Sequence, residues 1–149
     1  MRDLGLLLLR LGAGAILMAH GYPKLFGGPG KRPPEAMAKL LGPNYAEAVE
    51  QGGPEAFARF LESMGVAAPR AAAYLSGLAE FGGGLSLILG LKTRLAAPIV
   101  IFNMAMAIRK VHWQSGLYGQ GGYEFPFLLA VAAATLLLTG PGAYSVDGR

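Results

Sequence analysis

The chain contains no cysteine, and charged residues make up only 15 % of it, whereas a soluble domain usually carries about 25 %. The absence of cysteine excludes disulfides, thiolate metal sites and dithiol redox chemistry. The low charge accompanies 53 % hydrophobic residues and a mean hydropathy of +0.42. Such a composition indicates a chain that is either very well buried or embedded in lipid.

The chain also lacks the signatures of nucleic-acid and nucleotide binding. Its net charge is +4, but the basic residues are scattered over the connections rather than gathered with aromatic residues on one element, so we expect no nucleic-acid partner. The stretch GAGAIL has no third glycine, and GGPGKRP has no Ser or Thr after its lysine. Neither stretch therefore has the spacing of a phosphate-binding loop.

Four apolar segments are present, and each is close to the roughly 20 residues that cross a bilayer as a helix. They span approximately residues 4–21, 71–91, 94–111 and 124–140. Each is apolar around its whole circumference, as a lipid-facing and a bundle-facing side together require. We therefore predict an all-α fold, a membrane-embedded four-helix bundle that forms a single domain over residues 1–149. The first segment is a poor secretory signal, because Arg10 interrupts it and no A-x-A cleavage site follows.

The long loop 22–70 contains one further periodic segment, at approximately residues 54–65. Four large apolar residues recur there at i, i+3, i+4 and i+7, on one face of a helix. They are Phe57, Phe60, Leu61 and Met64. We expect this amphipathic helix to lie at the membrane interface or over the mouth of the bundle. Residues 29–53 carry no pattern from which we predict a structure or a role.

The predicted topology of four membrane crossings places several polar residues at one membrane face. With four spans, both termini lie on one face, and the opposite face receives the end of the first span, the end of the third and the start of the fourth. These ends carry His20, Lys24, Arg109, Lys110, His112 and Glu124. We predict that four of the six line a ligand-binding pocket, namely His20, Lys24, His112 and Glu124. The alternative is that each side chain separately reaches the lipid headgroups.

Glu80 lies near the middle of the second span, where a lone carboxylate is costly and should find a partner inside the bundle. Arg10 is the only basic residue in the interior of the first span. The two spans are antiparallel, and glycine and serine on the stripe around Glu80 allow a neighbouring helix to come close. We predict that Arg10 and Glu80 form a buried ion pair.

The order and spacing of several motifs resemble the DoxX family of four-helix bacterial membrane proteins. The matching stretches are R-L-G-x-G-x-x-x-x-x-H-G-x-x-K from residue 10, FLESMG, E-F-G-G-G-L-x-L-x-L-G-L from residue 80, GGYEFP and GPGAYSVD. The resemblance covers nearly the whole chain apart from residues 29–53. It places family positions at Arg10, His20, Lys24, Glu80 and Glu124, and it implies no catalytic residue.

The resemblance implies a link to quinone-linked redox chemistry, since the family is similar to a subunit of a thiosulfate:quinone oxidoreductase. Quinone carbonyls need donors such as His20, Lys24 or His112, and Glu124 is placed to relay protons. We therefore expect a redox-associated membrane subunit that binds a quinone or a similar small molecule and receives electrons from a partner protein or a bound cofactor. The alternative is a non-catalytic binder, carrier or scaffold for an anion, lipid or partner protein. Whether the chain is an enzyme stays open.

Other cofactors and the cellular location are expectations of the same kind. No metal site is expected, and neither is a haem, because His112 falls past the end of its helix. The resemblance implies the bacterial inner membrane, with cytoplasmic termini and the surrounding lipid as a partner. Basic residues flank the two faces equally, so their distribution gives no orientation. The sequence sets no oligomeric state.

Overall fold

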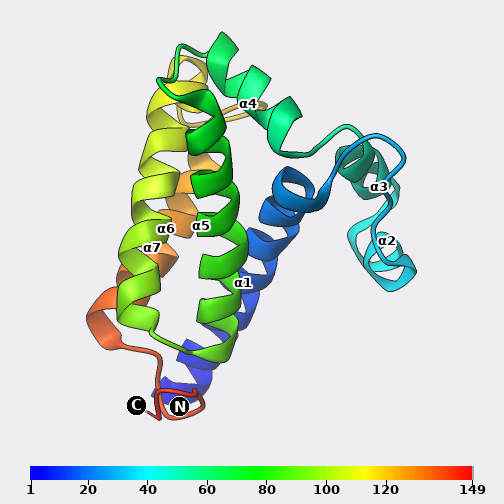
Figure 1. Cartoon of the computed structure of the whole chain (residues 1–149). Coiled ribbons are helices and arrows are strands. Elements are labelled where there is room, and N and C mark those ends of the chain that lie inside the picture. Colours follow the sequence, from blue (N-terminus) through cyan, green and yellow to red (C-terminus); the bar gives the residue numbers. More distant parts are fainter. Residues whose placement is uncertain (149) are drawn as a thin grey trace.

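A computed structural model describes residues 1–148 of the chain as helices and connections, with no strand among them. In chain order the elements are α1 (Arg2–Phe26), α2 (Glu35–Leu41), α3 (Pro43–Glu50), α4 (Pro54–Ser63), α5 (Pro69–Leu89), α6 (Thr93–Ala107), the π-helical turn η1 (Ile108–His112), the 3₁₀ turn η2 (Trp113–Ser115) and α7 (Glu124–Thr139). Figure 1 shows α1, α5, α6 and α7 running up and down in one bundle, with both termini at the end opposite α4. The predicted all-α bundle is therefore confirmed.

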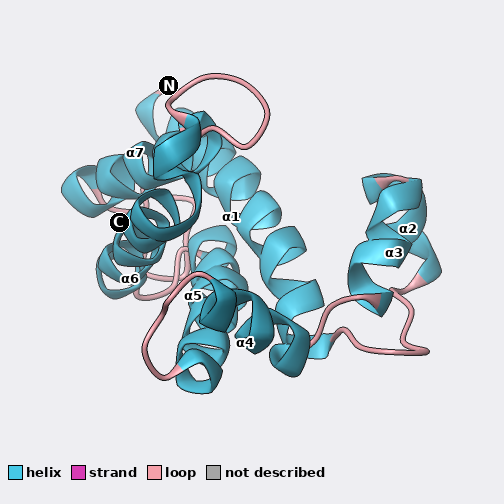
Figure 2. Ribbon diagram, turned by 90° about the horizontal axis from the view of Figure 1, so that it is seen from above, coloured by secondary structure: helices cyan, strands magenta, loops and turns pink. Residues whose placement is uncertain are grey.

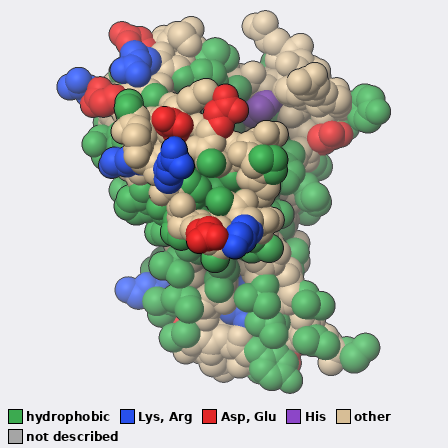
Figure 3. Space-filling model, turned by 90° about the vertical axis from the view of Figure 1, so that its right-hand side faces the viewer, with side chains coloured by type: hydrophobic (Ala, Val, Ile, Leu, Met, Phe, Trp, Pro, Cys, Tyr) green, Lys and Arg blue, Asp and Glu red, His purple; other side chains and the backbone are tan. Residues whose placement is uncertain are grey.

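Within residues 1–148, three helical runs are long and apolar enough to cross a membrane: α1, α5 and the run Thr93–Ser115 formed by α6, η1 and η2. The fourth helix, α7, is apolar along its length but has only 16 residues, about 24 Å of helix. The surface of the molecule agrees with a membrane-embedded bundle. One half of the face seen in the space-filling view is mainly apolar, and the acidic and basic side chains gather toward the other end (Figure 3).

The helix boundaries differ from the predicted ones in two places that matter for function. The first helix continues to Phe26, past its predicted end at Gly21, although Pro23 lies inside it. The third span stops being an α-helix at Ala107 and continues as the π-helical turn η1. Both changes lie at the end of the bundle opposite the termini, where the predicted polar residues are.

Glycines set the distance between α1 and α5. A Cβ added to Gly14 would lie 2.6 Å from the carbonyl oxygen of Gly84, and a Cβ added to Gly84 would lie equally close to the carbonyl oxygen of Gly14. The backbones of the two helices are therefore in direct contact, as small residues at membrane helix interfaces allow. Gly83 likewise allows α6 to pack closely on α5, because a Cβ added to it would lie 2.7 Å from the side chain of Val100.

Replacing Gly14 by alanine is expected to lower the free energy of unfolding by about 1–3 kcal/mol, because the new methyl group pushes α1 away from α5. The matched control is Gly12→Ala in the same helix, where an added Cβ meets no atom within 4 Å. This change should leave stability unchanged or raise it by up to about 1 kcal/mol through helix propensity. Thermal unfolding of the three proteins in detergent tests the difference. Equal melting temperatures of the two variants would contradict this account of the helix contact.

The predicted amphipathic helix is present as α4, which ends at Ser63, two residues earlier than expected. Figures 1 and 2 show it lying across the end of the bundle. Leu61 is buried and packs with Ala73 of α5, whereas Phe57 is half-buried and Phe60 is 43 % exposed. The apolar face is therefore divided, with part of it against the bundle and part of it outward.

The C-terminal segment closes the opposite end of the bundle. The amide of Val146 donates to the carbonyl of Leu89 at 3.0 Å, and the amide of Asp147 donates to the carbonyl of Gly90 at 3.1 Å. The carboxylate of Asp147 accepts from the amides of Lys92 and Thr93 at 3.1 and 3.3 Å. Backbone groups that would otherwise lack partners at the end of α5 and the start of α6 are satisfied in this way.

Candidate functional site

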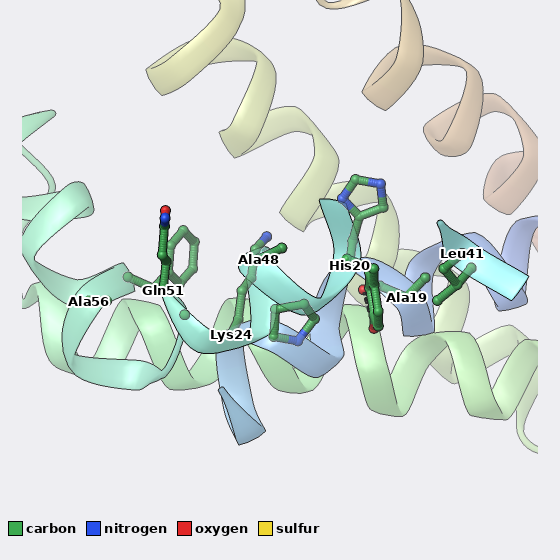
Figure 4. A pocket seen from close by; sticks show the side chains of 11 residues that line it. Ala19, His20, Lys24, Leu41, Ala48, Gln51 and Ala56 are labelled. Atoms are coloured by element: carbon green, nitrogen blue, oxygen red, sulfur yellow. Dashed lines mark hydrogen bonds between the residues drawn. The ribbon is translucent and has the colours of Figure 1, made fainter. Parts of the chain in front are cut away.

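A cavity of about 490 Å³ lies between the C-terminal part of α1 and the segment that carries α2, α3 and α4. It is lined by Ala19, His20, Pro23, Lys24, Leu41, Tyr45, Ala48, Gln51, Gly52, Ala56 and Phe57. In Figure 4, His20 and Lys24 extend from the same side of α1, as residues four apart in a helix do. The wall is mainly apolar with a few polar groups, which is typical of a site for a small organic molecule.

Pro23 explains how α3 is attached to α1. A proline has no backbone N–H, so inside α1 it leaves the carbonyl of Ala19 without its helical partner. The hydroxyl of Tyr45 in α3 donates to this carbonyl oxygen at 2.9 Å. Burial, and to a smaller extent the neighbouring Tyr22, raises the pKa of Tyr45 to about 12. The phenol is therefore protonated at neutral pH and remains a hydrogen-bond donor.

The junction between α3 and α4 lies directly on the end of α1. The amide of Gly53 donates to the carbonyl of Pro23 at 2.8 Å, and the amide of Gly28 donates to the carbonyl of Val49 at 2.8 Å. A Cβ at Gly52 would overlap the carbonyl of Pro23, so only glycine permits this approach. These backbone contacts attach the segment of residues 29–53 to the end of α1, and Figure 2 shows α2 and α3 on that side of the molecule. Residues of this segment line one wall of the cavity.

Lys24 connects the cavity to the interior of the bundle. Its Nζ lies 2.7 Å from Oε1 of Glu80 in α5 and 4.6 Å from the centre of the Phe57 ring. The side chain of Glu80 is only 6 % exposed, and that of Lys24 is 25 % exposed. The ammonium group is thus held between a buried carboxylate and an aromatic part of the cavity wall, where it gains both ionic and cation–π attraction.

The carboxylate of Glu80 is only partly satisfied. Asn103 in α6 donates through Nδ2 to the same oxygen, Oε1, at 3.4 Å. The other oxygen, Oε2, is buried and has no hydrogen-bond partner within residues 1–148. A buried polar atom without a partner is costly, and an ionisable residue inside a membrane bundle is by default a candidate for function. Lys24, Glu80 and Asn103 therefore form the polar centre beside the cavity.

The predicted ion pair between Arg10 and Glu80 is wrong. Arg10 is fully buried toward the other end of α1, where its guanidinium donates to the carbonyl of Tyr144 and, at 3.5 Å, to the carbonyl of Ile88. Lys24 is the partner of Glu80 instead, because α1 continues beyond its predicted end and carries Lys24 along α5. The carboxylate did require a basic partner from α1, but the register of the two helices selected a different residue.

Of the four predicted ligand-binding residues, two line the cavity and two do not. Nδ1 of His112 lies 2.8 Å from the carbonyl oxygen of Gly121 in the α6–α7 connection. Glu124 is exposed at the start of α7, and its carboxylate makes no ion pair with any residue that the structure describes. His20 approaches α7 through the ring of Phe125, at a centroid distance of 5.5 Å. A ligand-binding role of His112 and Glu124 stays a prediction that the cavity geometry does not favour.

Sequence reasoning missed Tyr45 and Gln51 as wall residues and did not place Asn103 among the candidate site residues. One signal for Tyr45 is present in the sequence, because a proline inside a helix frees the carbonyl four residues earlier. The proline predicts a free carbonyl acceptor at Ala19, but it does not predict which segment supplies the hydrogen-bond donor. The donor comes from residues 29–53, for which the sequence predicted no structure.

Comparisons with known proteins agree with this architecture. A sequence profile described as DoxX matches residues 5–113. The inner membrane protein YqjF of Escherichia coli strain K12 is 34 % identical over 93 residues, which cover 60 % of this chain and 68 % of that protein. No solved structure matches the chain. The matched range contains His20, Lys24, Glu80 and Asn103 and ends before α7.

Proposed function

The chain belongs to the DoxX family of integral membrane proteins, and on that premise we propose that it holds a quinone headgroup, or a small carbonyl compound like it, in the cavity beside α1. The observation that carries the proposal is the position of Lys24, which lines the cavity and is also the ionic partner of the buried Glu80. One donor thus serves both a ligand oxygen and the polar centre of the bundle.

The chemistry of the wall suits such a ligand. A quinone ring is flat and apolar and carries two carbonyl acceptors, so it needs aromatic surface and one or two donors. Phe57 and the phenol ring of Tyr45 supply the surface, and Lys24 and His20 supply N–H donors. The amide of Gln51 already donates to Glu47 at 2.8 Å through Nε2, which holds its side chain in place at the cavity wall.

A bound quinone supplies an acceptor for two electrons and two protons, and the chain contributes the surroundings. It has no cysteine, so we propose that electrons come from a partner protein. Lys24 orients the ligand by donating to an oxygen, and the apolar wall excludes water. The hydrogen bond from Lys24 to Glu80 connects the cavity with the polar centre inside the bundle. If no redox reaction accompanies binding, the same cavity makes the protein a non-catalytic carrier or scaffold.

The first experiment identifies the ligand directly. The protein is purified in mild detergent from bacterial membranes, its lipid extract is analysed for quinones by mass spectrometry, and its absorbance spectrum is recorded. We expect a quinone in amounts well above those in an extract of an unrelated membrane protein purified in parallel. An extract without quinone enrichment, together with no binding of added decylquinone, would leave the carrier or scaffold alternative.

Filling the cavity tests its location. Ala48 lines the cavity, and replacing it by phenylalanine adds a ring to the wall while Lys24 and Glu80 keep their identity. We expect decylquinone to bind at least about tenfold more weakly, since a blocked pocket loses more than about 1.4 kcal/mol. The matched control is Ala36→Phe in α2, an exposed position that does not line the cavity. Equal affinities of the two variants would show that the ligand binds elsewhere.

We also propose that both termini face the cytoplasm, which would put the cavity at the outer face of the inner membrane. A pair of C-terminal reporter fusions, one active only in the cytoplasm and one active only outside it, decides the orientation. Activity of the external reporter alone would reverse the assignment.

A further inference from the structure

A second cavity, separate from the first, lies where α6 changes into a π-helical turn. Its volume is about 350 Å³, and no residue that lines it also lines the cavity beside α1. The polar part of its wall consists of Arg109, Lys110, Gln114 and Ser115, and the apolar part includes Met64 at the end of α4 and Trp113. It therefore combines two cations and two neutral polar side chains with an apolar edge.

The turn that presents these residues is held in place from the α6–α7 connection. Residues Ile108–His112 form the π-helical turn, and such turns occur frequently at functional sites. The ring of His112 contacts the carbonyl of Gly121 at 2.8 Å. The ring of Trp113 stacks on that of Tyr123, with 5.6 Å between the centroids and 13° between the planes. The cavity wall is thus fixed by contacts that do not use its cations.

The two cations are not compensated by the protein. Neither Arg109 nor Lys110 has a carboxylate within 4 Å among residues 1–148, whereas Lys24, Lys39 and Arg70 each have one. Both residues are exposed. Two neighbouring positive charges without an acidic partner favour an anion with several oxygen atoms, since a phosphate accepts charge-assisted hydrogen bonds from both.

The location decides which phosphate compound fits. The turn ends the membrane-spanning run Thr93–Ser115, and a stacked Trp and Tyr pair is typical of the depth of the lipid headgroups. Lys and Arg side chains close to the membrane surface attract the headgroups of anionic lipids. We propose that this cavity is a binding site for the phosphate of an anionic phospholipid, with Arg109 and Lys110 on the phosphate and Met64 and Trp113 beside the glycerol and upper acyl region.

The chain provides its own probe for this site. Trp113 is the single tryptophan, and it is 63 % exposed. Its fluorescence is measured in mixed micelles in which either phosphatidylglycerol or phosphatidylcholine carries bromine in its acyl chains and quenches a nearby indole. We expect quenching by brominated phosphatidylglycerol at mole fractions several-fold lower than those needed for phosphatidylcholine, up to about 30-fold for two cations.

Neutralising the two cations should remove this preference. In Arg109→Gln/Lys110→Gln the two lipids should quench equally. The control Lys31→Gln/Arg32→Gln removes two exposed cations from the α1–α2 connection, at the same end of the bundle, and should keep the wild-type preference. Lys110→Glu alone provides a second test if the double variant does not fold, and it should favour phosphatidylcholine. Far-UV circular dichroism checks the fold of each variant.

Three results would overturn the proposal. The first is a wild-type protein without preference, and the second is a preference that survives in both Arg109→Gln/Lys110→Gln and Lys110→Glu. The third is an equal loss of preference in the Lys31→Gln/Arg32→Gln control, which would indicate a general charge effect. Inorganic phosphate is added at constant ionic strength in a separate arm. If it changes Trp113 emission without lipid and abolishes the preference, the site takes free phosphate rather than a phospholipid.

Discussion

Replacing Lys24 by methionine is expected to lower the free energy of unfolding by about 3–5 kcal/mol, because it leaves the buried carboxylate of Glu80 without its cation. Glu80 has no other basic partner within 4 Å in residues 1–148. The remaining hydrogen bond from Asn103 is long, at 3.4 Å, and cannot replace an ionic contact of 2.7 Å. Thermal or SDS-induced unfolding of the purified protein in detergent measures the change.

The chain offers a matched control for this prediction. Lys39 and Glu35 in α2 form an ion pair at the same distance, 2.7 Å, but their side chains are 76 % and 83 % exposed. Lys39→Met should therefore cost no more than about 0.5 kcal/mol, as exposed pairs do. The double variant Lys24→Met/Glu80→Gln should recover much of the loss, since it removes both charges. If the losses in Lys24→Met and in Glu80→Gln simply add up in the double variant, Lys24 and Glu80 do not interact energetically.

Replacing Arg10 by methionine is expected to destabilise the protein by about 3–6 kcal/mol, because two partly buried carbonyl groups each lose a charged donor at about 1.5–3 kcal/mol. These carbonyls belong to Ile88 in α5 and Tyr144 in the C-terminal segment. The guanidinium also lies against the backbone of Gly90, where an added Cβ would overlap it. Arg10 therefore ties α1, the end of α5 and the C-terminal segment together.

The loss should be local as well as global. Hydrogen exchange at the amides of Val146 and Asp147, which donate to the end of α5, should become faster in Arg10→Met than unfolding of the whole protein accounts for. Arg2→Met is the control, since Arg2 is exposed and makes one hydrogen bond of 3.3 Å to the carbonyl of Thr139. If the two variants have the same stability and the same exchange rates, Arg10 does not hold the C-terminal segment.

Much of the fold was predictable from the sequence, because lipid imposes simple requirements on a chain. A span needs about 20 apolar residues, and its backbone must be satisfied within a helix. Hydropathy therefore located α1, α5, α6 and α7, and periodicity located α4 (Figure 1). The same physics predicted that Glu80 takes a basic partner from α1, since no carboxylate is left alone in such an interior.

The identity of that partner depended on the register of α1 against α5, which composition does not contain. Arg10 and Lys24 are 14 residues apart in α1, or about 21 Å along the helix. The contact of Gly21 with Glu80 and the contact of Arg10 with Gly90 set the register. Ending the helix at Gly21, as the sequence suggested, leaves Lys24 outside the bundle, and the pairing then falls to the wrong residue.

The sequence by itself thus determined the class of fold, the crossing topology and the need for a buried ion pair, because these follow from the cost of exposing polar groups to lipid. Only the tertiary structure decided the cavity. Pro23 frees the carbonyl of Ala19 in any helix that contains it, but the donor that satisfies it is Tyr45, 26 residues later in the chain. This contact depends on how residues 29–53 fold back onto α1. No local sequence pattern predicts a contact between residues so far apart in the chain.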